Sequence, residues 1–200
     1  MGLMALCALA AFITACGGST EAELSASQIE VAEAIEAWGA AMEKEDYDKL
    51  WEMLSKEGQN VYARMLTAPG GVKETVGTLR TALDSEFTSP EDKDRIKRDL
   101  EKFPTFEALK VMTPQQYYGW RAKREQNPQT RKAVRELMKR ANMAEIVVEG
   151  EKATVLWRQK EQERFFMLKE DGKWKVSLAP KEQRELDAAE KREAEAKEKR

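Results

Sequence analysis

The fold is decided near the carboxyl end of the chain, where residues 166–176 read FMLKEDGKWKV. An Asp-Gly pair between two strand-like runs is a strong signal for a β-hairpin with a two-residue turn, because both turn positions require positive φ. Beyond the pair, Trp174, Val176 and Leu178 alternate with polar residues. This period of two predicts a final strand with one buried face, joined to the preceding strand by the turn at 171–172.

More strands are predicted before this hairpin. Residues 144–148 are rich in β-branched side chains and are followed by a turn around Gly150. Ala153, Val155 and Trp157 then lie at alternate positions, and a short apolar run at 165–168 leads into the hairpin. Because short turns connect these segments, the sequence predicts an antiparallel meander.

The amino-terminal part of the chain has the period of a helix instead. A first helix is predicted to begin at Ser27, because Ser followed three positions later by Glu30 forms a capping box. Its apolar stripe, spaced four, three and four, consists of Val31, Ile35, Trp38 and Met42. A second helix is predicted to start at Asp46 and to direct its apolar residues inward.

Breaks and caps divide the following residues into further helices. The sequence APGG at 68–71 interrupts the chain, and a helical run is predicted after it. The apolar positions of that run are Val72, Val76, Leu79, Leu83 and Phe87. Ser89, Thr113 and Asn127 each precede a proline, and a cap residue before Pro at the first helical position marks a helix start.

Helices first and a meander last predict an α+β fold, in which N-terminal helices pack on a C-terminal antiparallel sheet. The alternative is a helical bundle with a small appended sheet. We expect residues 1–15 to be a signal peptide, 16–26 a lipidated Cys with a flexible tether, and 27–179 a single domain. Residues 180–200 are expected to form a charged tail, helical or disordered, because Leu186 is the only large apolar side chain after Pro180.

The amino terminus predicts the cellular address. Residues 3–13 are uncharged and span about half of the roughly 20 residues that cross a bilayer, which suits the core of a secretory signal. The sequence ITAC at 13–16 resembles the bacterial lipobox. That resemblance implies cleavage before Cys16, lipidation of its sulfur and attachment to the periplasmic side of the cell envelope. Gly17, in place of the Asp that retains such proteins in the inner membrane, favours the outer membrane. A buried N-terminal helix is the alternative.

Composition excludes several classes of function. Lys and Arg number 34, Asp and Glu 36, and His is absent, for a net charge of −2. This balance argues against a nucleic-acid partner. Cys7 lies in the signal and Cys16 is the lipidation site, so the mature chain offers neither His nor free thiol. We therefore predict no metal site and no cofactor.

Charge is nevertheless concentrated locally. Residues 120–140 contain eight bases and two acids, whereas residues 21–57 are strongly acidic. The basic run is interpreted as a solvated helix face, as a surface that docks on the acidic helices of the same chain, or as a site for an anionic partner such as phospholipid headgroups. The first two are favoured, because exposed Lys and Arg on helices are ordinary.

Two segments carry a resemblance to a known fold. EDYDKLWEMLS at 45–55 and FMLKEDGKWKV at 166–176 resemble the nuclear transport factor 2-like superfamily, whose domains occur in small bacterial lipoproteins of unknown function. The resemblance covers the first two helices and the last strands. It implies a cone, in which a curved antiparallel sheet wraps a long helix and leaves an apolar pocket at the wide end.

The pocket implied by the resemblance would be lined by aromatic residues. The candidates are Trp38, Trp51, Tyr117, Tyr118 and Trp157, each of which core packing would also explain. We carry over no catalytic residue, because no family catalytic motif is present. Two functions follow: a non-catalytic binding or assembly module that takes an envelope protein or a small apolar ligand, or a pocket enzyme of isomerase or hydratase type.

Overall fold

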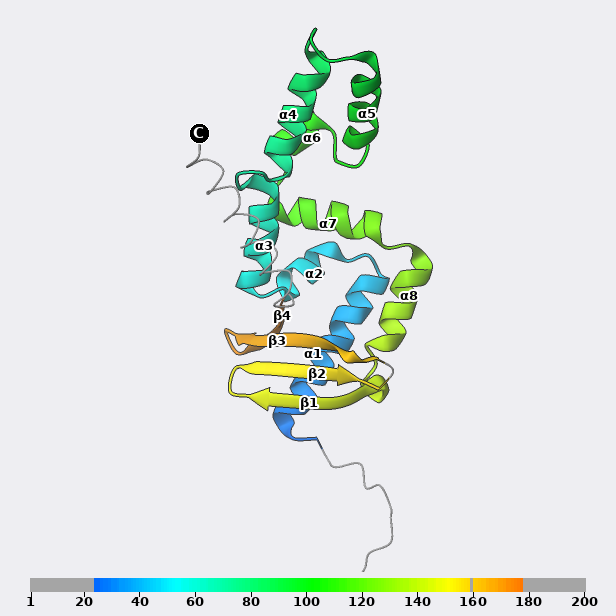
Figure 1. Cartoon of the computed structure of the whole chain (residues 1–200). Coiled ribbons are helices and arrows are strands. Elements are labelled where there is room, and N and C mark those ends of the chain that lie inside the picture. Colours follow the sequence, from blue (N-terminus) through cyan, green and yellow to red (C-terminus); the bar gives the residue numbers. More distant parts are fainter. Residues whose placement is uncertain (1–23, 159, 178–200) are drawn as a thin grey trace, which may run out of the picture.

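The computed structural model describes residues 24–158 and 160–177, with the backbone alone at 160–163. It has an α+β fold, with helices along the first two thirds of the chain and an antiparallel sheet after them (Figure 1). The predicted signal peptide, Cys16, Leu178 and the tail at 180–200 lie outside the described residues.

The sheet is a four-stranded meander in the order β1-β2-β3-β4, formed by β1 (Met143–Glu149), β2 (Lys152–Trp157), β3 (Lys160–Glu170) and β4 (Lys173–Ser177). The predicted hairpin is confirmed: Asp171 and Gly172 have φ of 51° and 75°, and Glu170 pairs with Lys173 across the turn. Strand β3 extends well before the apolar run that predicted it. The buried residues of β2 and β4 are Ala153, Val155, Trp157, Trp174 and Val176, as the alternation predicts.

Helix α1 (Ala26–Glu43) packs on one face of this sheet and buries the predicted stripe. The helix begins earlier than predicted, because Ser25 rather than Ser27 is the cap residue. Ser25 accepts from the Gln28 backbone, and the Gln28 side chain accepts from the Ser25 backbone. Leu24 and Ile29 occupy the two positions around this cap at which a hydrophobic staple forms.

Helices α2 (Tyr47–Met53) and α3 (Lys56–Thr67) follow α1 along the chain, and the junction between them contacts the last strand. Asp46 caps α2 as predicted, by accepting from the Lys49 backbone. The buried Ser55 then caps α3, while its backbone N–H donates to the Val176 carbonyl at 2.9 Å. One edge of the sheet is therefore covered by the α2–α3 junction.

Helices α4 (Val72–Asp84), α5 (Pro90–Leu100) and α6 (Phe106–Val111) form a lobe at the end of the molecule farthest from the sheet (Figure 1). The prediction that Phe87 continues the α4 stripe is wrong. Helix α4 ends at Asp84, with Ser85 as its C-cap, and Phe87 lies in the turn before α5 with its side chain fully exposed. The turn is held by Thr88, whose hydroxyl donates to the Ala82 carbonyl at 2.6 Å, and by the cap residue Ser89.

Helices α7 (Pro114–Glu125) and α8 (Pro128–Leu137), with the short 3-10 helix η1 (Arg140–Asn142), return the chain to the sheet. Helix α8 packs on α1, and arginines of the basic run meet acidic residues there. Arg131 is buried and pairs with Glu45, while Arg140 lies 3.8 Å from Glu33. This part of the basic run is docked on acidic residues of the first helix and of the turn that follows it.

Two hydrophobic clusters result, and helix α7 contributes to both. The larger cluster joins α1, α2 and α8 to all four strands, and we call these elements the body. The smaller one centres on Leu66, Val76, Leu109 and Tyr117. It supports α4, α5 and α6, which we call the lobe. Because the sheet shares the larger core with α1, it is an integral layer of the fold and not an appendage to a helical bundle.

Candidate functional site

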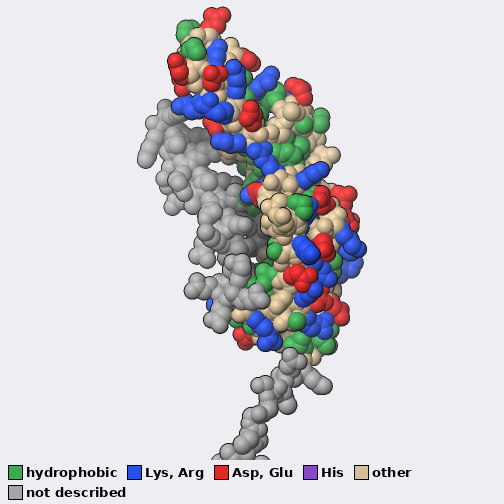
Figure 2. Space-filling view, turned by 90° about the vertical axis from the view of Figure 1, so that its right-hand side faces the viewer, with side chains coloured by type: hydrophobic (Ala, Val, Ile, Leu, Met, Phe, Trp, Pro, Cys, Tyr) green, Lys and Arg blue, Asp and Glu red, His purple; other side chains and the backbone are tan. Residues whose placement is uncertain are grey.

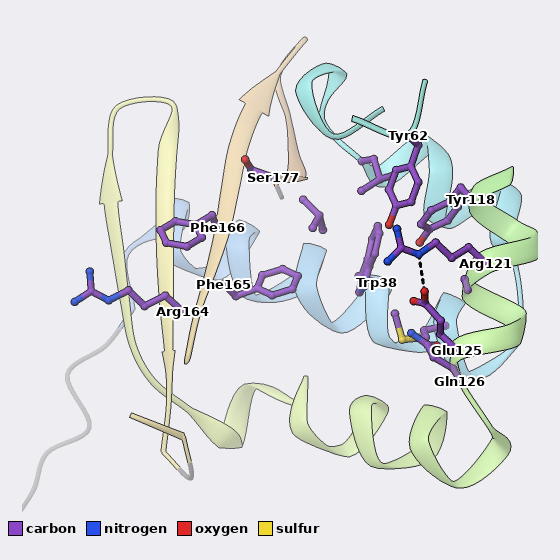
Figure 3. Close-up of a pocket in the computed structure, with 14 residues that line it drawn as sticks. Trp38, Tyr62, Tyr118, Arg121, Glu125, Gln126, Arg164, Phe165, Phe166 and Ser177 are labelled. Carbon is purple, nitrogen blue, oxygen red and sulfur yellow. Dashed lines mark hydrogen bonds and ion pairs between the residues drawn. The ribbon is translucent and has the colours of Figure 1, made fainter. Parts of the chain in front are cut away.

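A cavity of 270 Å³ lies where α1, α3 and α7 meet β3 and β4. Figure 3 shows side chains from these elements turned toward one space. Its apolar lining consists of Trp38, Met42, Leu54, Tyr62, Tyr118, Ala122, Phe165, Phe166 and Val176, and its polar lining of Arg121, Glu125, Gln126, Arg164 and Ser177. The volume is slightly below the roughly 300–1,000 Å³ of typical ligand pockets, so it suits a small ligand or one end of a larger one.

The wall on the helical side is a packed group of three aromatic rings. Tyr62 and Tyr118 meet edge to face with their centroids 4.9 Å apart, and Trp51 lies 5.9 Å from Tyr118 and 6.4 Å from Tyr62. Aromatic pairs of this geometry contribute about 0.5–1.5 kcal/mol each beyond the area they bury. The wall is therefore held in place by its own packing.

Burial determines the protonation of the Tyr118 hydroxyl. Removal from water raises the pKa of Tyr118 well above the usual value for tyrosine, and the nearby Tyr62 and Tyr47 raise it further. The hydroxyl therefore stays protonated at any physiological pH and can serve as a hydrogen-bond donor. Proton transfer to and from this group would need a pKa near the working pH, whereas burial moves the pKa of Tyr118 away from it.

A charged pair lies at one end of the cavity. Nε of Arg121 donates to Oε1 of Glu125, one turn later on α7, at 2.5 Å, and Nη1 lies 3.2 Å from Sδ of Met65. Burial acts to lower the pKa of Arg121, but the hydrogen bond and charge of Glu125 outweigh it, so that the pKa is raised. The cavity thus contains a permanent positive charge beside an aromatic wall.

A second polar group lies behind the cavity, between α7 and α8. The backbone carbonyl of Gln126 accepts from Nη1 of Arg131 at 2.7 Å. Its side-chain Oε1 is buried without a hydrogen-bond partner among the described residues, and so is the Tyr47 hydroxyl. An unsatisfied buried polar atom costs about 1–3 kcal/mol. Gln126 also lines the cavity, so its amide adds hydrogen-bonding capacity at that end.

The structure separates the five predicted pocket residues. Trp38 and Tyr118 line the cavity, and Trp51 lies behind Tyr118. Trp157 is buried in the sheet core, 6.1 Å from the Phe165 ring that lines the cavity. Tyr117 faces the lobe, where it stacks on Trp120 with centroids 6.0 Å apart. Neighbours on a helix point about 100° apart, so one face of α7 serves the cavity and another the lobe.

Sequence reasoning did not select Arg121, Glu125 or Phe165 as pocket residues. Arg121 and Glu125 follow Tyr118 by three and seven positions, the spacing of one helix face, but the basic run around them conceals that pattern. Phe165 begins four consecutive apolar residues, so alternation could not tell which of them face inward. Tyr62 could be identified from the sequence as a candidate pocket tyrosine, beside Tyr117 and Tyr118.

Other classes of site find no support in the part of the chain that the structure describes. Across residues 24–158 and 160–177, no group of three or more His, Cys, Asp or Glu side chains is placed to hold a metal ion. Within the same ranges, no helix has the length and apolar character needed to cross a bilayer.

Comparisons with protein-family models, curated proteins and solved structures find no match to this chain. The similarity to the nuclear transport factor 2-like superfamily therefore stays a prediction from two short segments.

Proposed function

We propose that this chain is a lipid-anchored, non-catalytic binding module of the bacterial cell envelope, which holds a small apolar ligand or the apolar end of a larger one in the cavity between α7 and the sheet. The observation that carries the proposal is the aromatic lining of this cavity, in which Trp38, Tyr118 and Phe165 face the same space (Figure 3). Apolar pockets with a few polar groups at one end are the usual form of ligand sites.

The chemistry of the lining favours binding over catalysis. An isomerase or hydratase needs a group whose pKa lies near the working pH and a partner that orients it. The pKa of Tyr118 is moved away from neutrality by burial, and Glu125 is engaged by Arg121. These groups suit recognition of a ligand, because burial keeps the Tyr118 hydroxyl a hydrogen-bond donor and Glu125 already accepts a hydrogen bond from Arg121.

A cavity-filling variant tests the binding function. Ala122 lines the cavity from α7, so Ala122→Phe should occupy the space with the protein's own side chain. We expect 1-octanol to bind the wild-type chain saturably in calorimetry and to lose most of that binding in Ala122→Phe. Ala133→Phe, at an exposed position of α8, is the matched control and should bind as the wild type does. Equal binding by all three proteins would contradict the proposed site.

The anchoring part of the proposal rests on the lipobox-like sequence at 13–16. Two or more acyl chains give stable membrane attachment, whereas a single chain is marginal. Cells grown with labelled palmitate should incorporate label into the wild-type protein and not into Cys16→Ser. Undiminished labelling of that variant would remove the lipid anchor from the proposal and leave the cavity argument untouched.

A further inference from the structure

The charge of Arg121, which lines the cavity, indicates which kind of ligand head group the cavity favours. Arg121 extends from α7 so that its guanidinium lies between the hydroxyl ends of Tyr62 and Tyr118 and the ring of Trp38 (Figure 3). Only 35% of its side chain is exposed. An arginine in such a place is desolvated in part, and its remaining donors are directed at the cavity and its walls.

The guanidinium of Arg121 has a strong hydrogen-bond acceptor on one edge and a weak one on another. Glu125 occupies the Nε edge with a 2.5 Å hydrogen bond, whereas Nη1 meets the thioether of Met65 at 3.2 Å. A guanidinium has five N–H donors, and a thioether is a weak acceptor. The edge away from Glu125 therefore has donor capacity that a strong acceptor in the cavity would use.

The guanidinium favours an anionic acceptor. The ionised side chains that meet at the helical end of the cavity are Arg121 and Glu125, whereas Arg164 is exposed and extends away from the other lining side chains (Figure 3). Hydrogen bonds between a guanidinium and an anion are shorter and about twice as strong as neutral ones, and they strengthen where aromatic walls exclude water. A cationic head group would meet Arg121 at close range and be repelled.

We infer that the ligand of the proposed pocket is an amphipathic anion, with an alkyl or aromatic body against Trp38 and Phe165 and an acidic head group on the Arg121 guanidinium. This inference rests on the proposed binding function and adds the charge of the ligand to it. The cavity volume of 270 Å³ limits the enclosed part to a short chain or a small ring system. Carboxylic acids of medium chain length, free or released from a lipid, have this chemistry.

Three probes that share one chain and differ in head group test the inference: octanoate, 1-octanol and octylammonium. Each is titrated by calorimetry at pH 7 into the full-length chain carrying Cys16→Ser, in otherwise wild-type form and with Arg121→Met or Arg121→Lys. Lys123→Met, which removes the same charge from an exposed position of α7 outside the cavity lining, is the matched control. Melting temperatures of all variants establish that they are folded.

Octanoate should bind about tenfold more tightly than 1-octanol, the equivalent of one net charge-assisted contact of about 1.4 kcal/mol. Arg121→Met should remove that preference and leave 1-octanol within about twofold, Arg121→Lys should keep part of it, and Lys123→Met should behave as the parent chain. Equal binding of octanoate and 1-octanol, with no effect of Arg121→Met, would overturn the anion inference while the pocket stands. Failure of all three probes to bind would overturn the proposed function as well.

Discussion

The body and the lobe differ in how far along the sequence their stabilising contacts reach. In the body, ion pairs join distant segments, among them Glu45 to Arg131, Glu33 to Arg140 and Glu30 to Lys169, beside a local pair of Glu136 with Lys139. In the lobe, the ion pairs lie within single helices or at their ends, three residues apart: Asp92 with Arg95, Asp94 with Lys97, Asp99 with Lys102 and Glu107 with Lys110. Figure 2 shows acidic and basic side chains interspersed over the lobe.

The hydrophobic cores of the body and the lobe also differ in how many segments of the chain they join. The body buries aromatic and aliphatic residues from α1, α2, α8 and every strand in one cluster, whereas the buried residues of the lobe cluster are few. Pairs three residues apart on a helix surface contribute about 0.2–0.5 kcal/mol each and do not hold one helix to another. We therefore expect the body to unfold as a unit and the lobe to open at a lower free energy.

The largest expected effect comes from emptying the body. Trp174 is 6% exposed, and its indole N–H donates to Glu30 at 3.2 Å. Trp174→Ala should lower the free energy of unfolding by about 3–5 kcal/mol, the usual range for the loss of a large core side chain. Urea denaturation followed by far-ultraviolet circular dichroism measures this. A loss below about 1 kcal/mol would show that the sheet core is not what holds the body together.

A matched change in the lobe should act locally. Leu109 is 1% exposed in the small cluster. Leu109→Ala should lower the free energy of opening the lobe by about 2–5 kcal/mol. In native-state hydrogen exchange, amides of α4, α5 and α6 should exchange faster while those of β2 and β3 keep their protection. Leu50→Ala, at a fully buried site of the body, should accelerate exchange in the sheet. Equal acceleration of sheet amides by both variants would mean that body and lobe form one cooperative unit.

A smaller effect is expected from pH. The hydrogen bond and charge of Lys169, with a further hydrogen bond from Trp174, lower the pKa of Glu30 below its usual 4.5. Because the folded-state value is the lower one, the stabilisation is present above pH 4.5 and is lost as the pH falls through the lowered pKa. Glu30→Gln should therefore reduce the difference in urea midpoint between pH 7 and pH 3.

The lobe provides the control for this titration. Lys102 lowers the pKa of Asp99 in the same direction, through a pair three residues apart. Asp99→Asn should change the pH dependence of global unfolding less than Glu30→Gln does, because its partner belongs to the same local turn. The reverse order would contradict the distinction between long-range and local pairs.

The smallest effect is expected at the tip of the lobe. The Phe87 side chain is fully exposed, and its turn is held by the Thr88 hydroxyl, by the cap residue Ser89 and by the Phe87 backbone N–H, which donates to the Ser85 hydroxyl and is kept in a substitution. Phe87→Ser should change stability by no more than about 0.5 kcal/mol, as for other surface positions. Differential scanning calorimetry measures this, and a clear drop in melting temperature would show that the side chain packs against something.

The elements that the sequence predicted share one property, which is a local signal with a single interpretation. The Asp-Gly turn, the stripe of α1 and the caps at Asp46, Ser89, Thr113 and Asn127 are all of this kind, and all are confirmed. The errors arise where two local signals overlap. Ser25 and Ser27 each have a partner three residues on, and the apolar spacing of α4 continues to Phe87 although Ser85 has already ended the helix.

The cavity could be predicted only in part, because it depends on contacts between distant segments. Trp38 and Tyr118 were identifiable as aromatic residues on helix faces. That Arg121 points into the same space follows from the packing of α7 on α2 and α3, which no local pattern records. Phe165 reaches the cavity because β3 pairs it with Val155, and that register is set by the strands on either side.

The central claim is that the cavity between the body and helices α3 and α7 holds a ligand and that the lobe does not take part. Titration of 1-octanol into the isotopically labelled chain, followed by amide and indole chemical shifts, tests it most directly. We predict saturable shifts for the Trp38 indole and for the amides of Tyr118 and Phe165, which line the cavity, and none for residues 76–96. Shifts that do not saturate, or that are largest in the lobe, would contradict the account.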